Sequence, residues 1–191
     1  AFAKSGITSV EIPGSIKEIA SCSFKVTPLE SVTLHNGIEK IHSAAFRTCK
    51  ITTIRIPGSV NTISKYAFQN CCVLTDVTFD NPAGITEVLY SSFEGTPWLS
   101  NQMKQSDSLV IGSTLVGVHT NDKQYTIPEG IEAISPFAFE TCSNLKEVSF
   151  PEGITELSYG VFNRCDSLER INLPNSLKVI SSRAGESPFS I

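Results

Sequence analysis

Six cysteines and three histidines are the side chains of this sequence that could act as nucleophiles or metal ligands. The cysteines form no C-x-x-C pair, and Cys49 and Cys71, like Cys142 and Cys165, stand 22 or 23 residues apart. Single cysteines that recur in this way do not converge on a tetrahedral metal site. The sequence also has no H-E-x-x-H, G-x-S-x-G or glycine-rich phosphate-binding motif. We therefore expect neither a metal site nor a cofactor.

Histidines and carboxylates are dispersed rather than clustered. His35 and His42 could together bind a metal weakly, but we interpret them, and His119, as separate surface residues. A glycosidase needs two carboxyl groups about 5–10 Å apart across one cleft, and nothing in the sequence builds such a cleft. We therefore expect a protein that is not an enzyme. The acidic residues at outward positions are Glu11, Glu18, Glu87, Glu129, Glu152 and Glu156.

Composition excludes several classes of partner. The 191 residues include 15 basic and 19 acidic side chains, which gives a formal charge of −4. A nucleic-acid groove or a basic membrane surface needs clustered lysine and arginine, so we expect no nucleic acid as partner. No apolar run approaches the roughly 18 residues of a membrane-spanning helix, so we expect no direct membrane insertion. Hydrophobic residues make up 40%, which suffices for a core.

The elements that position these side chains come from a repeat. Phenylalanines recur every 22 to 25 residues, with one interval of 46, and a proline stands 11 residues before five of them. Each proline follows a run in which apolar and polar residues alternate, which predicts a strand with its second and fourth residues buried. Apolar residues three and six positions after the proline predict a second short extended segment. The phenylalanines are Phe2, Phe24, Phe46, Phe68, Phe93, Phe139 and Phe162.

A unit of this length cannot bury its own apolar face, so successive units must stack with their phenylalanines packed between them. Cysteine recurs three positions after the phenylalanine, where other units have serine or threonine. Stacked strands lie about 4.8 Å apart, so disulfides between neighbouring cysteines are geometrically possible. The exchange with serine and threonine instead favours free, buried thiols that bond to the backbone. Cys22 and Cys72 fall outside this series.

The pattern L/I-x-x-V/I-x-I-P-x-x-I-x-x-I-x-x-x-A-F-x-x-C resembles the BspA-like class of leucine-rich repeats, with the best matches at 51–71, 125–142 and 145–165. The resemblance implies an α+β, mostly β solenoid, a right-handed leucine-rich-repeat superhelix of 22–23-residue units. It also implies a bacterial cell-surface or secreted protein that adheres to host or matrix proteins. The expected organisation is a single solenoid, residues 1–191, with repeats at 1–96 and 124–191.

An insertion at about 97–123 interrupts the repeat. Residues 98–104 predict a short helical turn, and 108–111 and 114–118 predict a β-hairpin around Gly112 and Ser113. The segment Gly-Thr-Pro-Trp-Leu at 95–99 is one that the resembling family often carries before such a hairpin. Trp98 has two interpretations: it anchors a contact made by a protruding loop, or it fills the gap where the repeat is skipped.

The outward strand residues provide the best candidate for a binding face, although a plain solvated sheet has the same pattern. They are short and polar, and they lack the aromatic platform expected for sugars. We hypothesise a non-catalytic protein-interaction or adhesion module of a larger extracellular or cell-surface protein, with a host or matrix protein as ligand. The alternative is a carbohydrate-binding or substrate-presenting module attached to an enzyme. The candidate face consists of Glu11, Thr33, Arg55, Thr78, Thr126, Ser149 and Asn172.

The two ends of the sequence are irregular. The chain starts inside a unit, at Ala1 and Phe2, and we expect it to be a fragment of a longer array. In the last unit Gly185 stands where a phenylalanine is expected, and Phe189 is a candidate substitute from outside the register.

Overall fold

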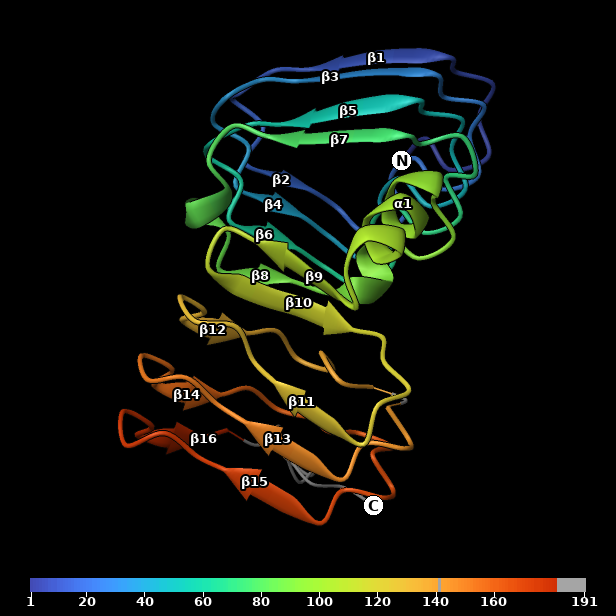
Figure 1. Cartoon of the computed structure of the whole chain (residues 1–191). Coiled ribbons are helices and arrows are strands. Elements are labelled where there is room, and N and C mark those ends of the chain that lie inside the picture. The colour runs from blue at the N-terminus through green and yellow to red at the C-terminus, as the bar shows by residue number, and fades with distance from the viewer. Residues whose placement is uncertain (141, 182–191) are drawn as a thin grey trace. The chain divides into compact units, whose positions relative to one another are not determined.

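A computed structural model describes residues 1–140 and 142–181 (Figure 1). Contacts within the chain divide it into two units, Ala1–Gln105 and a second that starts at Ser106. Each unit is a stack of coils, where a coil is one repeat of the sequence. The expected solenoid of short strands is confirmed. Gly185 and Phe189 lie outside the described residues.

Two parallel layers of strands build the first unit (Figure 1). Equivalent positions of successive coils pair in register, as Val10 with Val32 and Ile41 with Ile63. The alternating runs before the prolines form the long strands β1 (Ser9–Ile12), β3 (Ser31–Leu34), β5 (Thr53–Ile56) and β7 (Asp76–Phe79). The second segments form the short strands β2 (Glu18–Ile19), β4 (Lys40–Ile41), β6 (Thr62–Ile63) and β8 (Glu87–Val88).

The second unit repeats this plan and adds the hairpin. β9 and β10 pair antiparallel, as the sequence predicts, and β10 continues parallel to β12. The hairpin therefore starts the short-strand layer of this unit. The strands are β9 (Ser108–Ile111), β10 (Thr114–Val118), β11 (Gln124–Thr126), β12 (Ala133–Ile134), β13 (Glu147–Ser149), β14 (Glu156–Leu157), β15 (Arg170–Asn172) and β16 (Val179–Ile180).

The phenylalanines stack through the coils as expected. From Phe2 to Phe93, successive ring centroids lie 5.3 Å apart with nearly parallel planes. In the second unit Phe139 and Phe162 are 5.1 Å apart. Burying one such ring contributes about 1.5–3 kcal/mol, so this column is a main source of stability in each unit.

Each phenylalanine lies in a chain reversal that we call the turn edge of the coil. Residues two before and two after the phenylalanine there have left-handed backbone angles, for example Ala44 (φ 56°) and Thr48 (φ 60°) around Phe46. Valine is unfavourable in this conformation because its side chain is β-branched, yet Val26 has φ 57°. Such positions cost about 1–3 kcal/mol each, so the stacked core must stabilise this edge.

The end of the first unit departs from the regular coil. The 3₁₀ helices η1 (Pro82–Gly84) and η2 (Tyr90–Ser92) occupy the coil with the longer spacing. The helix α1 (Pro97–Gln105) follows, longer than the helical turn that the sequence predicts. Proline at its first position and a hydrogen bond from Leu99 N to Thr96 Oγ1 (3.2 Å) explain its start. The predicted insertion is thus divided, because α1 belongs to the first unit and the hairpin to the second.

Some apolar positions that the pattern predicts to be buried are exposed. Ile16 is 44% exposed in the first coil, and Leu173 is 44% exposed in the last described coil. Their equivalents Ile38, Val60 and Ile127 are buried. The difference arises because a middle coil is covered on both sides, whereas the coils described at either end are covered on one side only.

Candidate functional site

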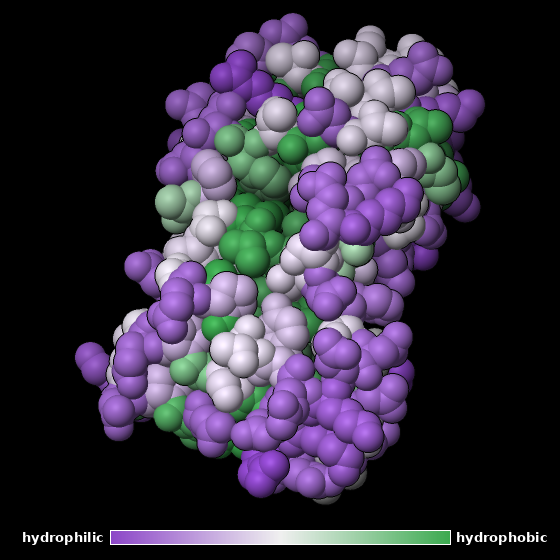
Figure 2. All heavy atoms as spheres, in the orientation of Figure 1, coloured by the Kyte–Doolittle hydropathy of each residue, from purple (hydrophilic) through white to green (hydrophobic). Residues whose placement is uncertain are grey.

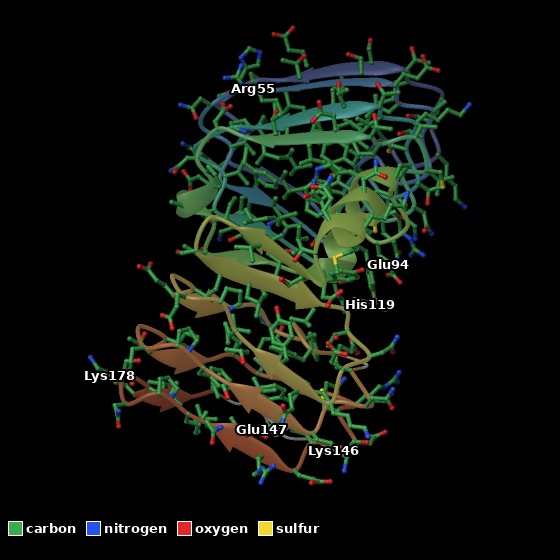
Figure 3. All side chains as sticks on the ribbon, in the orientation of Figure 1. Arg55, Glu94, His119, Lys146, Glu147 and Lys178 are labelled. Atoms are coloured by element: carbon green, nitrogen blue, oxygen red, sulfur yellow. The ribbon has the colours of Figure 1, made fainter. Side chains whose placement is uncertain are left out.

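The outward column, defined as the third residues of the long strands, is exposed and in register in the first unit. Glu11 pairs with Thr33 across β1 and β3, and Arg55 pairs with Thr78 across β5 and β7. No ladder of strand hydrogen bonds joins β3 to β5 among the described residues, so the column consists of two pairs here. Arg55, labelled in Figure 3, donates from Nε to Asp80 Oδ1 at 2.6 Å. This contact raises the pKa of the guanidinium.

In the second unit the outward column is continuous over three strands. Thr126, Ser149 and Asn172 are register partners on β11, β13 and β15. The amide nitrogen of Asn172 donates to Ser149 Oγ and to Glu147 Oε1, both at 3.3 Å. Hydrophilic residues gather over these three strands (Figure 2). The candidate residues of this unit therefore form one pre-arranged polar surface.

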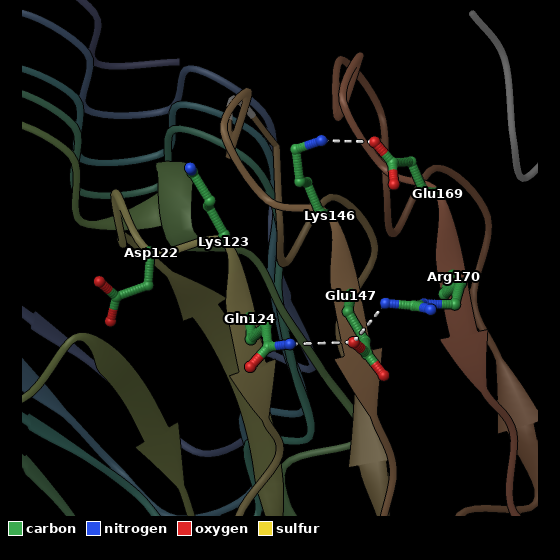
Figure 4. A pocket seen from close by; sticks show the side chains of 7 residues that line it. All are labelled: Asp122, Lys123, Gln124, Lys146, Glu147, Glu169 and Arg170. Carbon is green, nitrogen blue, oxygen red and sulfur yellow. Dashed lines mark hydrogen bonds and ion pairs between the residues drawn. The ribbon is translucent and has the colours of Figure 1, made fainter.

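A hollow of about 530 Å³ lies beside this part of the outward column (Figure 4). It is open to solvent, and it runs over the first residues of β11, β13 and β15. Every lining residue is polar or charged, which suits a polar protein surface better than an apolar ligand. The lining residues are Asp122, Lys123, Gln124, Lys146, Glu147, Glu169 and Arg170.

Glu147 is the organising side chain of the hollow. It accepts hydrogen bonds from Gln124 Nε2 at 3.0 Å and from Arg170 Nη2 at 3.2 Å (Figure 4). The bond from Asn172 is a third. Next to it, Lys146 Nζ donates to Glu169 Oε1 at 2.5 Å. The Lys146 ammonium lowers the pKa of the Glu169 carboxyl, so that this carboxyl stays ionised in weak acid.

The residues of the hollow were not predicted from the sequence, although the repeat contains a signal for them. Gln124, Glu147 and Arg170 are the first residues of their strands, and period two places them on the same face as the third residues. The neighbouring polar, acidic and basic side chains of Gln124, Glu147 and Arg170 are recognised as a set only when the coils are aligned. Treating both outward positions of each strand together would have identified them.

The histidines and carboxylates form separate surface pairs. His35 Nε2 lies 2.6 Å from Glu11 Oε1, and His42 Nε2 lies 3.0 Å from Glu18 Oε2. The described residues include no group of three histidine, cysteine or acidic side chains that could hold a metal ion. Within the same residues, no helix is long and apolar enough to span a membrane.

The repeated cysteines are structural thiols. All six cysteines are free, and the four in the repeat position are buried. Cys71 donates from Sγ to Phe46 O of the preceding coil at 3.0 Å, and Cys165 donates to Phe139 O at 3.1 Å. Thr27 and Thr96 use their hydroxyls for the same purpose within their own turns. Small hydrogen-bonding side chains are therefore exchangeable at this position, as the sequence indicated.

Only two thiols should react with a water-soluble disulfide reagent in the native protein. Burial raises the pKa of Cys71 and of Cys165 to about 12, so these thiols stay protonated at pH 8. Cys72 is exposed and Cys22 partly exposed, so we expect one fast and one slower equivalent in a colorimetric thiol assay. The remaining four should react only in denaturant.

The Cys72→Ser variant is the control for this assay, and it should remove the fast equivalent alone. Fast native modification of three or more thiols would contradict the burial of the repeat cysteines.

Trp98 lies inside the first unit. Its ring centroid is 4.8 Å from that of Phe93 and 6.4 Å from that of Phe79, and the residue is 7% exposed. Its backbone N–H donates to Leu74 O at 2.9 Å. Such packing is expected of a side chain that fills the gap beside the phenylalanine column, which is the second of the two interpretations above.

One sequence family accounts for this architecture. The family model described as "BspA type Leucine rich repeat region" matches residues 1–116 and 118–187 in six copies. No curated protein matches the sequence significantly.

Solved structures with a similar arrangement share about a fifth of their residues with this chain. The pneumococcal vaccine antigen PcpA is 21% identical, with 93% of this chain and 56% of that chain covered and a TM-score of 0.46. A leucine-rich cell surface protein of Faecalibacterium prausnitzii is 20% identical, with 96% and 63% covered and a TM-score of 0.41. The leucine-rich repeat protein of T. pallidum is 19% identical, with 91% and 73% covered and a TM-score of 0.41. This chain thus spans less than two thirds of the first two.

Proposed function

This chain belongs to the BspA-type leucine-rich repeat family, and from that premise we propose that it is a non-catalytic module that binds another protein through its outward column. The observation that carries the proposal is the in-register row of Thr126, Ser149 and Asn172, in which Thr126 and Asn172 are exposed and Ser149 is half-buried. Stacked repeats offer such extended surfaces to protein ligands. The family's association with surface and secreted proteins supports an extracellular or cell-surface location, within a larger protein that adheres to a host or matrix protein.

The hollow supports a protein ligand rather than a sugar. Four of its charged side chains are already held in two ion pairs, Lys146 with Glu169 and Arg170 with Glu147, so a partner with complementary charges would meet little reorganisation cost. In the two parts of the chain that the structure describes, no aromatic side chain lines the hollow. A sugar-binding site usually presents such a ring to a sugar face, so the carbohydrate-binding alternative lacks its platform here.

The proposal is tested by binding to a panel of immobilised matrix proteins. Thr126→Arg places a long cation in the outward column, and we expect affinity for the bound matrix protein to fall about tenfold or more. Thr155→Arg is the matched control, because Thr155 is an equally exposed threonine next to the short strand β14. It should bind like the wild type.

Equal loss in both variants would contradict a role for the outward column. Binding of uncharged glycans on an array, with no matrix protein bound, would replace the proposal with the carbohydrate-binding alternative.

A further inference from the structure

Five basic residues lie in the turn edge of the first unit or shortly after it. Lys25 and Arg47 both follow the stacked phenylalanine of their coils, and the backbone joins these coils by a bond from Val26 N to Arg47 O (2.8 Å). Lys4 N donates to Lys25 O (3.0 Å), which places a third basic residue beside them. We call the set the basic edge. It consists of Lys4, Lys25, Arg47, Lys50 and Lys65.

The members of the basic edge have no acidic partners. Over the described residues, none of the five forms an ion pair, whereas Lys17, Lys40 and Arg55 elsewhere in this unit are paired with Glu39, Glu18 and Asp80. Coils stack about 5 Å apart, so like charges at this edge repel one another. Such a concentration of cations, left unneutralised by the fold, favours an anionic ligand.

Tyr66 holds two of the cations in place. Arg47 lies 5.8 Å and Lys65 5.6 Å from the centroid of the Tyr66 ring. Cation–π contacts of this kind restrict long, flexible side chains, which lowers the entropy lost when a ligand binds. The series of basic residues that directly follow the phenylalanines ends at Arg47, because the next two coils have Gln69 and Glu94 in that position. Gln69 Nε2 donates to Glu94 Oε2 at 2.7 Å.

The backbone of the edge is closed to strand addition by a peptide. The N–H groups of Val26, Thr48 and Asn70 all donate to the next coil, at 2.8–2.9 Å. A peptide that binds by β-augmentation needs unpaired backbone groups, and a peptide helix needs an apolar groove. With these three N–H groups already paired, the edge offers recognition chiefly through charge arranged along a line.

We propose that the basic edge binds a linear sulfated polysaccharide, whose anionic groups follow one another along the direction in which the coils stack. This site is separate from the outward column, and it does not depend on the proposed function. The ligand would contact Lys25, Arg47 and Lys65, with Lys4 and Lys50 adding charge on either side. Binding should weaken as salt concentration rises, because the ligand releases counterions when it is neutralised.

The test measures binding of a size-defined heparin oligosaccharide to the full chain at low and at physiological salt. A triple variant, Lys25→Gln with Arg47→Gln and Lys65→Gln, should bind about tenfold or more weakly and show a shallower salt dependence. The matched control replaces Lys17, Lys40 and Arg55 by glutamine. The control also removes two lysines and one arginine, but these side chains are already paired with acidic residues. Its heparin binding should therefore change less than about twofold.

Four results would overturn the proposal. Three of them are no heparin binding at physiological salt, equal loss in both triple variants, and binding of fully desulfated heparin as tight as that of heparin. Tighter binding of polyglutamate than of heparin would overturn it in favour of an acidic peptide. None of these results depends on a matrix protein, so failure here is distinct from failure of the outward column. Circular dichroism is the measurement that checks whether both variants are folded.

Discussion

Phe46→Ala should lower the free energy of unfolding of the first unit by about 3–5 kcal/mol. Phe46 is fully buried, and its ring stacks between those of Phe24 and Phe68 at 5.3 Å on either side. The substitution leaves a cavity that both neighbours line, so two coil interfaces are weakened together. Urea unfolding followed by circular dichroism measures the effect.

Phe2→Ala is the control for this loss, because Phe2 has a stacking partner on one side and is 49% exposed. We expect it to cost about 1 kcal/mol. Similar losses in the two variants would show that the phenylalanines act as independent core residues and not as a stacked column.

Trp98→Ala should also destabilise the first unit by about 3–5 kcal/mol, because a large ring packed against Phe79 and Phe93 is removed. Trp98→Phe keeps part of this packing and should cost less. Thermal unfolding compares the two variants with the wild type.

Binding separates the two interpretations of Trp98. If the residue fills the gap beside the phenylalanine column, Trp98→Ala should bind the matrix-protein panel normally at a temperature where it stays folded. Lost binding with unchanged stability would instead make Trp98 a direct contact residue.

The long strands of the first unit could be predicted to the residue, because alternation marks all four and a proline directly follows two of them. The runs before Pro13 and Pro57 became β1 and β5 with the expected bounds. In the second unit the strands end one residue earlier, so that Ile127 and Phe150 follow them. Periodicity alone could not show where backbone pairing stops, because pairing depends on the neighbouring coil.

The turn edge was harder to predict. Non-glycine residues such as Val26 and Tyr66 adopt left-handed angles there, although nothing in their types favours that conformation. Each of them stands two positions from the buried phenylalanine of its own turn, Phe24 or Phe68, so this conformation depends on the packing of the turn. The basic edge was missed for a related reason: Lys25 and Arg47 are 22 residues apart in the sequence, and a search for adjacent charges does not detect them.

The candidate site was predictable only as a surface. Repeat alignment identified Thr126, Ser149 and Asn172 as outward residues on neighbouring strands, and the structure places them in register. The hollow depends on which side chains of the adjacent column meet, as Glu147 meets Arg170. Those contacts are set by side-chain length and rotamer, which a repeat pattern does not contain.

Stacking by hydrogen bonds between successive coils has a mechanical consequence. The hydrogen bonds from Phe24 N to Ala45 O and from Phe46 N to Ala67 O join successive coils and point along the stacking direction. A pulling force along that direction therefore breaks the bonds of one coil before those of the next. Each coil of 22 residues would then extend by about 70 Å as it is released. A stack of coils therefore unfolds one coil at a time under a pulling force and dissipates energy at every step. A sheet that is sheared instead breaks all its hydrogen bonds at once.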